Sequence, residues 1–112
     1  MDDQTDNRLL RIFIGESDRY EGRPLYQAIV EALRKAGLAG ATVLRGIEGF
    51  GKSSHLHTAH ILRLSEDLPI VIECVDTYDR IESIFPTLDA MIGDGLVTME
   101  RVEVRVYRAN RE

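Results

Sequence analysis

The chain has 112 residues, 44% of them hydrophobic and 29% charged, which is typical of one globular domain. Its formal charge of −5 argues against general nucleic-acid binding, because phosphate backbones select clustered positive charge. The single cysteine, Cys74, excludes a disulfide within the chain, and no apolar run approaches the roughly 20 residues that span a bilayer. With an acidic, polar N-terminus, we expect a cytoplasmic protein without direct membrane insertion.

The first part of the chain predicts a strand and then a helix. Residues 1–8 have little to bury, so we expect a disordered tail. Leu9–Ile14, LLRIFI, is rich in β-forming residues and predicts the first strand. Pro24 suits the first helical position, and Gly37 ends the helix. The apolar residues at helical spacing are Leu25, Ile29, Val30, Leu33 and Ala36.

The middle of the chain predicts two further strands. The second begins near Gly40 and extends to Ile47 or beyond, leading into a glycine-rich stretch. Thr58–Leu64 fits either a short helix or an extension of a strand. Leu68–Val75, LPIVIECV, is a continuous apolar run and predicts the third strand, in which Cys74 is expected to be a buried core thiol.

The last third predicts a helix and a final strand. Asp76 is placed to cap a helix over Tyr78–Met91, and Pro86 should kink or break that helix. The alternation of Val102 to Val106 favours a strand over Leu96–Tyr107. A polar tail, 109–112, follows a single domain that covers 9–108.

The resulting order, βαββαβ, predicts the ferredoxin-like α+β fold, with two helices on one face of an antiparallel sheet. The predicted strands carry more apolar residues than one helix layer explains. We therefore expect a trimer or a dimer to form through the uncovered face.

Gly46–Ser53, GIEGFGKS, satisfies the spacing of a phosphate-binding P-loop. A P-loop enzyme needs a parallel sheet, which this strand order does not provide, so nucleotide hydrolysis by that mechanism is not expected. Glycine-exposed backbone N–H groups and Lys52 still favour an anion. The alternative is a glycine-rich hairpin that binds nothing by itself.

Three histidines, His55, His57 and His60, follow this loop in the pattern H-x-H-x-x-H. Imidazole groups at this spacing can hold zinc, copper or nickel. No single helix or strand would aim all three at one ion, so a solvated flap is the alternative.

The run Ile92–Gly95, IGDG, separates the second helix from the last strand. It can be a helix C-cap followed by a turn, or a second phosphate-contacting loop. Ser53, Ser54 and His57 are close in sequence, but a catalytic triad is defined by geometry, and nothing here predicts that geometry.

Several segments together resemble a known family. ATVLRGIEGFGK at 41–52 resembles the start of the T-loop in PII signalling proteins, IGDGLV at 92–97 resembles their I-G-D-G-K-I loop, and LPIVIECVD at 68–76 resembles their third strand. Over residues 9–107 the chain is most similar to the uncharacterised PII-like family named domain of unknown function 190. Leu96 stands where PII proteins have a lysine, so one phosphate contact is missing.

The resemblance implies a homotrimer that binds a small effector, such as the adenine nucleotides AMP, ADP or ATP, in clefts between subunits. The effector-binding residues that it implies are Gly49, Phe50, Gly51, Lys52, Ser53, Ile92, Gly93, Gly95 and Arg105.

Three hypotheses for function follow. In the first, an effector orders the loop 52–61, which then regulates a partner protein such as a transporter or an enzyme. In the second, His55, His57 and His60 make a metal-binding trimer, like the trimeric copper-tolerance proteins of the same fold class. The third, a nucleotide hydrolase dependent on Lys52, lacks a candidate general base.

Overall fold

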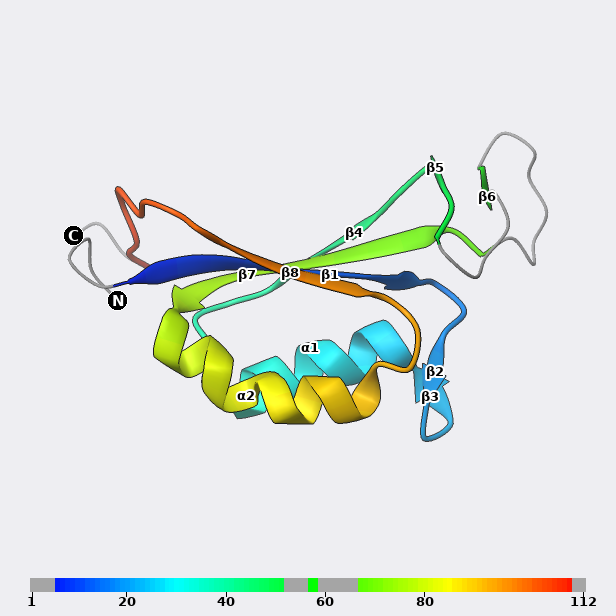
Figure 1. The fold of residues 1–112 in the computed structure, drawn as a ribbon, viewed down its shortest axis with the longest axis horizontal. Helices are drawn as coiled ribbons and strands as arrows, with labels where there is room; N and C mark the ends of the chain where they lie inside the picture. Colours follow the sequence, from blue (N-terminus) through cyan, green and yellow to red (C-terminus); the bar gives the residue numbers. More distant parts are fainter. Residues whose placement is uncertain (1–5, 52–56, 59–66, 110–112) are drawn as a thin grey trace.

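The computed structural model describes residues 6–51, 57–58 and 67–109. A four-stranded antiparallel sheet, in the order β4-β7-β1-β8, carries two helices on one face (Figure 1). The sheet strands are β1 (Asn7–Gly15), β4 (Thr42–Arg45), β7 (Pro69–Thr77) and β8 (Leu96–Arg101). The helices are α1 (Leu25–Lys35) and α2 (Tyr78–Met91). Outside this sheet, β2 (Arg19–Tyr20) pairs with β3 (Arg23–Pro24), and β5 (Glu48–Gly49) pairs with β6 (His57–Thr58). The predicted α+β, ferredoxin-like fold is confirmed.

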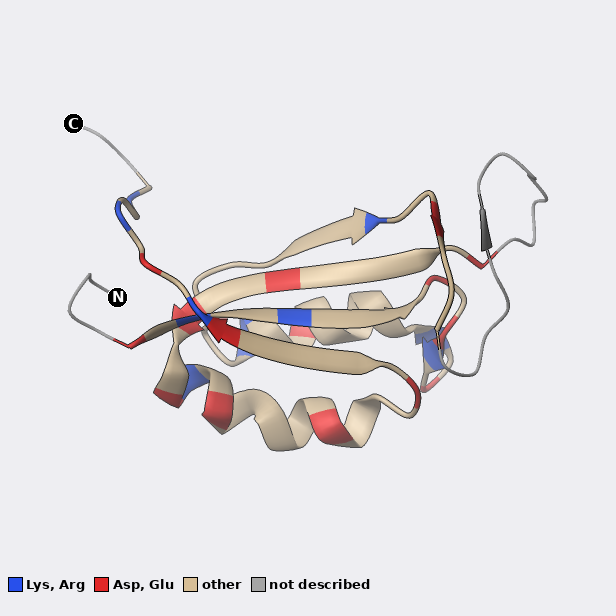
Figure 2. Ribbon diagram, turned by 45° about the horizontal axis from the view of Figure 1, so that its top comes forward, with Lys and Arg blue, Asp and Glu red and all other residues tan. Residues whose placement is uncertain are grey.

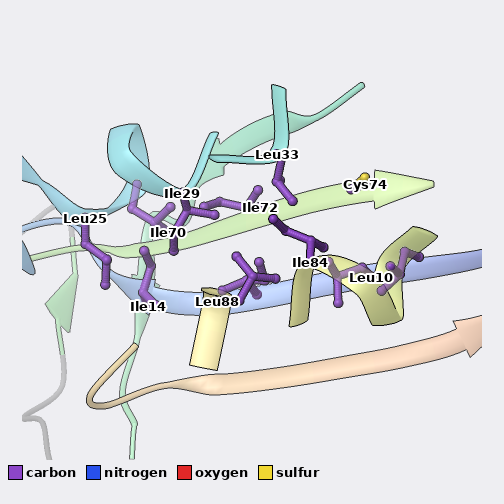
Figure 3. Close-up of a cluster of buried hydrophobic side chains, with 12 residues drawn as sticks. Leu10, Ile14, Leu25, Ile29, Leu33, Ile70, Ile72, Cys74, Ile84 and Leu88 are labelled. Atoms are coloured by element: carbon purple, nitrogen blue, oxygen red, sulfur yellow. The ribbon is translucent and has the colours of Figure 1, made fainter. Parts of the chain in front are cut away.

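Alternation along the central strands creates the core. Every second residue is buried beneath the helices from Leu10 to Ile14 in β1 and from Ile70 to Asp76 in β7, and Ile12 lies directly opposite Ile72 in the register. Both of these side chains are 0% exposed. Figure 3 shows the cluster between sheet and helices. Its members are Leu10, Ile12, Ile14, Leu25, Ile29, Leu33, Ile70, Ile72, Cys74, Ile81, Ile84 and Leu88.

Helix α1 begins one residue later than Pro24 suggested. Pro24 is the N-cap, with extended backbone angles, and Leu25 is the first helical residue. Gly37 ends the helix as predicted, because its φ of 82° is costly for other residues. The Leu38 N–H donates to the Leu33 carbonyl at 3.1 Å, which closes the helix end.

Helix α2 corrects the prediction for Asp76. Its N-cap is Thr77, whose hydroxyl accepts from the Arg80 N–H at 3.3 Å. The Asp76 carboxylate is 1% exposed and accepts from the N–H groups of Ala39 and Thr77, each at 2.7 Å. It therefore ties the α1–β4 connection to the end of β7. Pro86 lies inside α2, and the helix continues past it to Met91, so no break occurs.

The final strand is shorter than the predicted Leu96–Tyr107 and ends at Arg101. Arg101 pairs with Arg8, one residue from the start of β1, and the Val102 N–H still donates to the Asn7 carbonyl at 3.2 Å. Beyond that point β1 offers no more backbone to pair with. Residues 102–107, which we call the C-terminal arm, leave the sheet there (Figure 1).

Other boundaries also shift. β1 starts at Asn7, so Asn7 and Arg8 belong to the sheet and not to a tail. The second large strand is Thr42–Arg45, shorter than the predicted stretch that began near Gly40. Of the ambiguous segment Thr58–Leu64, Thr58 is in β6, and the rest lies outside the described residues.

No described helix covers the sheet face opposite the helices (Figure 1). On this face the register aligns Leu44, Val71, Phe13 and Leu96 across all four strands, and we call this set the apolar row. In the adjacent row, the Arg11 guanidinium pairs with Glu73 at 2.9 Å, and it also pairs with Glu100, which lies opposite Leu9 in the row beyond, at 2.7 Å. Leu44 and Leu96, at the two ends of the apolar row, are 49% and 56% exposed. None of the described helices is long and apolar enough to cross a membrane.

Candidate functional site

The glycine loop that follows β4 lies against the start of β7. The Gly46 N–H donates to the Pro69 carbonyl at 2.7 Å. A Cβ at Gly46 would be 2.8 Å from the Pro69 ring, and one at Gly49 would be 3.1 Å from it. A side chain at Gly46 would therefore force the backbone or the ring to shift, and one at Gly49 would be a tight fit against the same ring. Gly49 pairs with His57 in the short β5–β6 ladder.

The side chains of this loop project outward. Ile47 and Phe50 are each 76% exposed, the highest values among the large apolar side chains of the described residues. Gly51 is exposed as well. Lys52 and Ser53, the two predicted effector contacts that follow, lie outside the described residues.

The second predicted loop, Ile92–Gly95, joins α2 to β8. Ile92 is the helix C-cap, and its N–H donates to the Leu88 carbonyl at 3.0 Å. A Cβ at Gly95 would lie 2.7 Å from the Phe13 carbonyl oxygen, so only glycine permits this approach to β1. Nothing lies within 4 Å of such an atom at Gly93, so one face of the loop is open.

The two loops lie at the same end of the sheet but at opposite edges. Gly46–Gly51 follows the edge strand β4, and Gly93–Gly95 precedes the other edge strand, β8. Strands β7 and β1 lie between them, which is a separation of roughly 14 Å at about 4.8 Å per strand. A single phosphate group therefore cannot contact both loops of one chain.

This end of the sheet is rich in carboxylates (Figure 2). Arg45 pairs with Glu16 at 2.9 Å, while Asp18 and Asp67 accept backbone N–H groups of Gly15 and Ser17. The acidic residues around the four strand ends are Glu16, Asp18, Glu48, Asp67 and Asp94. An anion bound here needs positive charge beyond Arg45.

Arg105 lies at the other end of the sheet, in the C-terminal arm. The arm and residues 39–42 form the walls of a groove of about 660 Å³, with Leu9 and Val75 between them. The Tyr107 hydroxyl donates to the Ala39 carbonyl at 3.4 Å, which joins the two walls. Within one chain, the structure thus separates Arg105 from both glycine loops.

Sequence reasoning missed this groove. The alternation of Val102, Val104 and Val106 predicted that the last strand continues, but these residues lie outside the sheet and the chain bends at Arg105. It could not indicate that the sheet ends at Arg101, because that depends on where β1 begins.

The remaining candidates are a thiol and the histidines. Burial, followed by the nearby Asp76 carboxylate, raises the pKa of Cys74 to about 11, so this thiol is a core group. His57 contributes its backbone to β6, while His55 and His60 lie outside the described residues. Within the described ranges, no group of His, Cys, Asp and Glu side chains is arranged to hold a metal ion.

Comparison with known proteins assigns this chain to a family. The family model DUF190, described as Uncharacterized ACR, matches residues 7–104. A UPF0166 protein of Aquifex aeolicus is 37% identical over 97 residues, covering 87% of this chain and 91% of that protein.

Solved structures share the fold at lower identity. CPII of Thiomonas intermedia K12, a nitrogen regulatory PII-like protein bound to ADP, AMP and bicarbonate, matches with a TM-score of 0.60 and 19% identity, over 88% of this chain and 87% of CPII. The divalent ion tolerance protein CutA1 of Ehrlichia chaffeensis matches with a TM-score of 0.56 and 13% identity, over 94% and 87%. The chain therefore belongs to the DUF190 family and has the PII-like fold.

Proposed function

We propose that this protein is a trimeric PII-like regulator that binds a small anionic effector, an adenine nucleotide, in clefts between subunits. The separation of the predicted effector residues carries this proposal. Gly46–Gly51, Gly93–Gly95 and Arg105 lie at two edges and two ends of one sheet, so one ligand can meet all three only across an interface. Further support comes from CPII, a protein of the same fold whose structure contains ADP and AMP.

The charge distribution favours effectors with one or two phosphates. Carboxylates surround the glycine loops, and Leu96 offers no cation beside Gly95. Each added phosphate oxygen increases the repulsion that Lys52 and the arginines of a neighbouring subunit must offset. We therefore expect AMP and ADP to bind more tightly than metal-free ATP.

Regulation follows if the effector binds two states of the loop 52–61 with different affinity. That loop directly continues Gly49–Gly51, so an effector held by these glycines is adjacent to it in the chain. A partner protein, such as a transporter or an enzyme, would then bind one state of the loop. We expect binding without turnover.

Calorimetry on the purified trimer tests the proposal directly. AMP, ADP and ATP are titrated separately, after light scattering has established the trimer mass. Lys52→Ala and Arg105→Ala should each weaken binding about tenfold or more, because each removes a charged partner of the phosphate. Arg34→Ala, on the surface of α1, is the matched control and should leave the affinity unchanged. A confirmed trimer that gives no heat with any of the three nucleotides contradicts the proposal.

Metal binding is the second candidate, because CutA1, a divalent ion tolerance protein, has a similar fold. His55, His57 and His60 are its only proposed ligands. Metal analysis of the purified chain, with and without replacement of all three histidines by alanine, tests this candidate. Equal metal content in the two chains rules the cluster out.

A further inference from the structure

The C-terminal arm is attached to the rest of its own chain at two points. At the start of the arm, the Val102 N–H donates to the Asn7 carbonyl at 3.2 Å. At its far end, the Tyr107 hydroxyl donates to the Ala39 carbonyl at 3.4 Å. Among the residues that the structure describes, no hydrogen bond joins 103–106 to another segment. The second attachment therefore depends on one hydroxyl group.

Arg105 lies between these two attachments. The chain bends at Arg105, three residues after Val102 and two residues before Tyr107. The Arg105 side chain is exposed, and no carboxylate in the described part of the chain pairs with its guanidinium. The position of this positive charge is therefore set by the course of the arm and not by a contact of the side chain itself.

The acceptor of the Tyr107 hydrogen bond belongs to a segment that is itself firmly held. The N–H of Ala39 donates to the Asp76 carboxylate at 2.7 Å, and this carboxylate is 1% exposed. The Arg80 guanidinium donates to the Gly37 carbonyl at 2.9 Å. Hydrogen bonds to charged groups are the stronger ones. These two bonds fix the α1–β4 connection to the end of β7 and to the first turn of α2, so Tyr107 attaches the arm to the folded core.

The second attachment restricts where Arg105 can lie. With both attachments present, the arm follows the groove opposite residues 39–42. Without Tyr107, Arg105 is three residues from its only remaining attachment, and at about 3.4 Å per residue it can take any position within roughly 10 Å of Val102. Ordering such a segment opposes ligand binding, whereas a segment ordered beforehand binds more tightly.

We propose that Tyr107 is a positioning residue for effector binding. Its hydroxyl holds the arm against Ala39 and thereby fixes the place at which Arg105 meets the phosphate group of the effector. The inference rests on the proposed function, in which Arg105 is one of the charged partners of an anionic effector. Tyr107 acts through Arg105 and does not contact the effector itself.

Calorimetry with AMP on the full-length trimer tests this role through Tyr107→Phe, which keeps the ring and removes only the hydroxyl. AMP should bind about three- to tenfold more weakly, as expected for the loss of one hydrogen bond. The trimer mass and the urea unfolding curve should not change, because Tyr107 is 58% exposed and lies outside the sheet. Tyr26→Phe is the matched control and should leave the affinity unchanged, since the Tyr26 hydroxyl meets the side chain of the adjacent Gln27, at 3.5 Å.

A double-mutant cycle separates a positioning role from a direct contact. If Tyr107 acts through Arg105, the chain with both Tyr107→Phe and Arg105→Ala should bind AMP as weakly as Arg105→Ala alone. Additive losses would show that Tyr107 contacts the effector directly, and lower stability or a lost trimer in Tyr107→Phe would show a purely structural role. Each of these results overturns the proposal.

Limited trypsin digestion tests the attachment without any ligand. Trypsin cleaves after arginine, and cleavage follows the population of the open chain. Cleavage after Arg105 should be about three- to tenfold faster in Tyr107→Phe than in the unmodified protein or in Tyr26→Phe. Equal rates overturn the attachment.

Failure of the inference and failure of the proposed function give different results. An unmodified trimer that binds AMP, together with a Tyr107→Phe chain that binds it equally well, overturns the positioning role and leaves the function standing. An unmodified trimer that gives no heat with any adenine nucleotide overturns the function and, with it, the role of Tyr107 in effector binding.

Discussion

The two faces of the sheet are built from the same strands but differ in how deeply their side chains are buried. Under the helices, β1 and β7 bury Ile12 and Ile72 completely. On the other face, the same two strands present Phe13 and Val71, which are only partly buried. The alternation is equally regular on both faces, so the difference lies in what covers them. The chain covers one face by itself and leaves an apolar row available for contact with another molecule.

This difference has an energetic meaning. Removing apolar surface from water contributes about 25 cal/mol per Å². The covered face gains this contribution during folding of a single chain, whereas the open face gains it only on association. The contribution of the open face to the free energy of unfolding should therefore depend on protein concentration, as in other associating proteins.

Truncation of one side chain on each face of β7 should give the largest contrast. Ile72→Ala leaves a cavity in the core and should lower the free energy of unfolding by about 2–5 kcal/mol. Val71→Ala removes a partly buried side chain and should cost about 1 kcal/mol or less in the monomer. Urea unfolding at several protein concentrations measures both. A concentration-dependent loss for Val71→Ala assigns the open face to an interface, and equal losses at all concentrations contradict that assignment.

The thiol on the covered face of β7 should give the next largest effect, through pH. The folded state keeps Cys74 protonated, because burial and Asp76 raise its pKa from 9.0 to about 11. The unfolded thiol ionises first, so the contribution to stability is complete below about pH 9 and is lost as the pH rises toward 11. At about 1.4 kcal/mol per pKa unit, this amounts to roughly 2–3 kcal/mol.

The matched chain for this measurement is Cys74→Ala, which removes the thiol and keeps every other group that titrates at alkaline pH. Unfolding curves from pH 8 to 11 should diverge between the two chains. Parallel curves contradict a buried, neutral thiol.

Removing the buried carboxylate should have a smaller effect. Asp76→Ala leaves the N–H groups of Ala39 and Thr77 without their acceptor and should lower the free energy of unfolding by about 1–3 kcal/mol. Asp89→Ala, on the exposed side of α2, is the control and should change stability by about 0.5 kcal/mol or less. Amide exchange at Ala39 should accelerate in the first variant only. Equal protection of that amide in both variants argues against the Asp76 contact.

The smallest effect in the monomer is expected on the open face. Arg11→Gln leaves Glu73 and Glu100 without their shared cation, yet all three side chains are partly exposed. The cost should be about 1 kcal/mol or less, and added salt should reduce it. Urea unfolding at low and high salt measures it. A salt-independent loss of several kcal/mol would show that this row is desolvated, as it would be within an assembled protein.

Periodicity predicted most of the fold, because the burial of Ile12 and Ile72 depends on local alternation. The same pattern overextended the last strand, since the alternation of Val102 to Val106 does not reveal that its partner strand starts at Asn7. Asp76 was mistaken for a helix cap because its acceptor role involves Ala39, 37 residues away in sequence.

The candidate site was predicted only in part. Both glycine loops could be located from composition, and their close approaches to Pro69 and Phe13 explain why glycine occurs there. Their positions at opposite edges follow from the strand order, which no local pattern encodes. The position of Arg105 depends on the course of the C-terminal arm, which depends in turn on the start of β1.

The contact of Gly46 and Gly49 with Pro69 has a consequence for sequence length. It brings together the two ends of the connection that runs from Gly51 to Asp67, whatever number of residues lies between them. Loop-closure entropy changes by only about 0.6 kcal/mol for each doubling of length. Insertions and deletions in 52–56 and 59–66, which spare the residues of β6, should therefore be tolerated far better than one methyl group at Gly46. We expect relatives to differ most in length within 52–66, because a change of partner protein would change this segment.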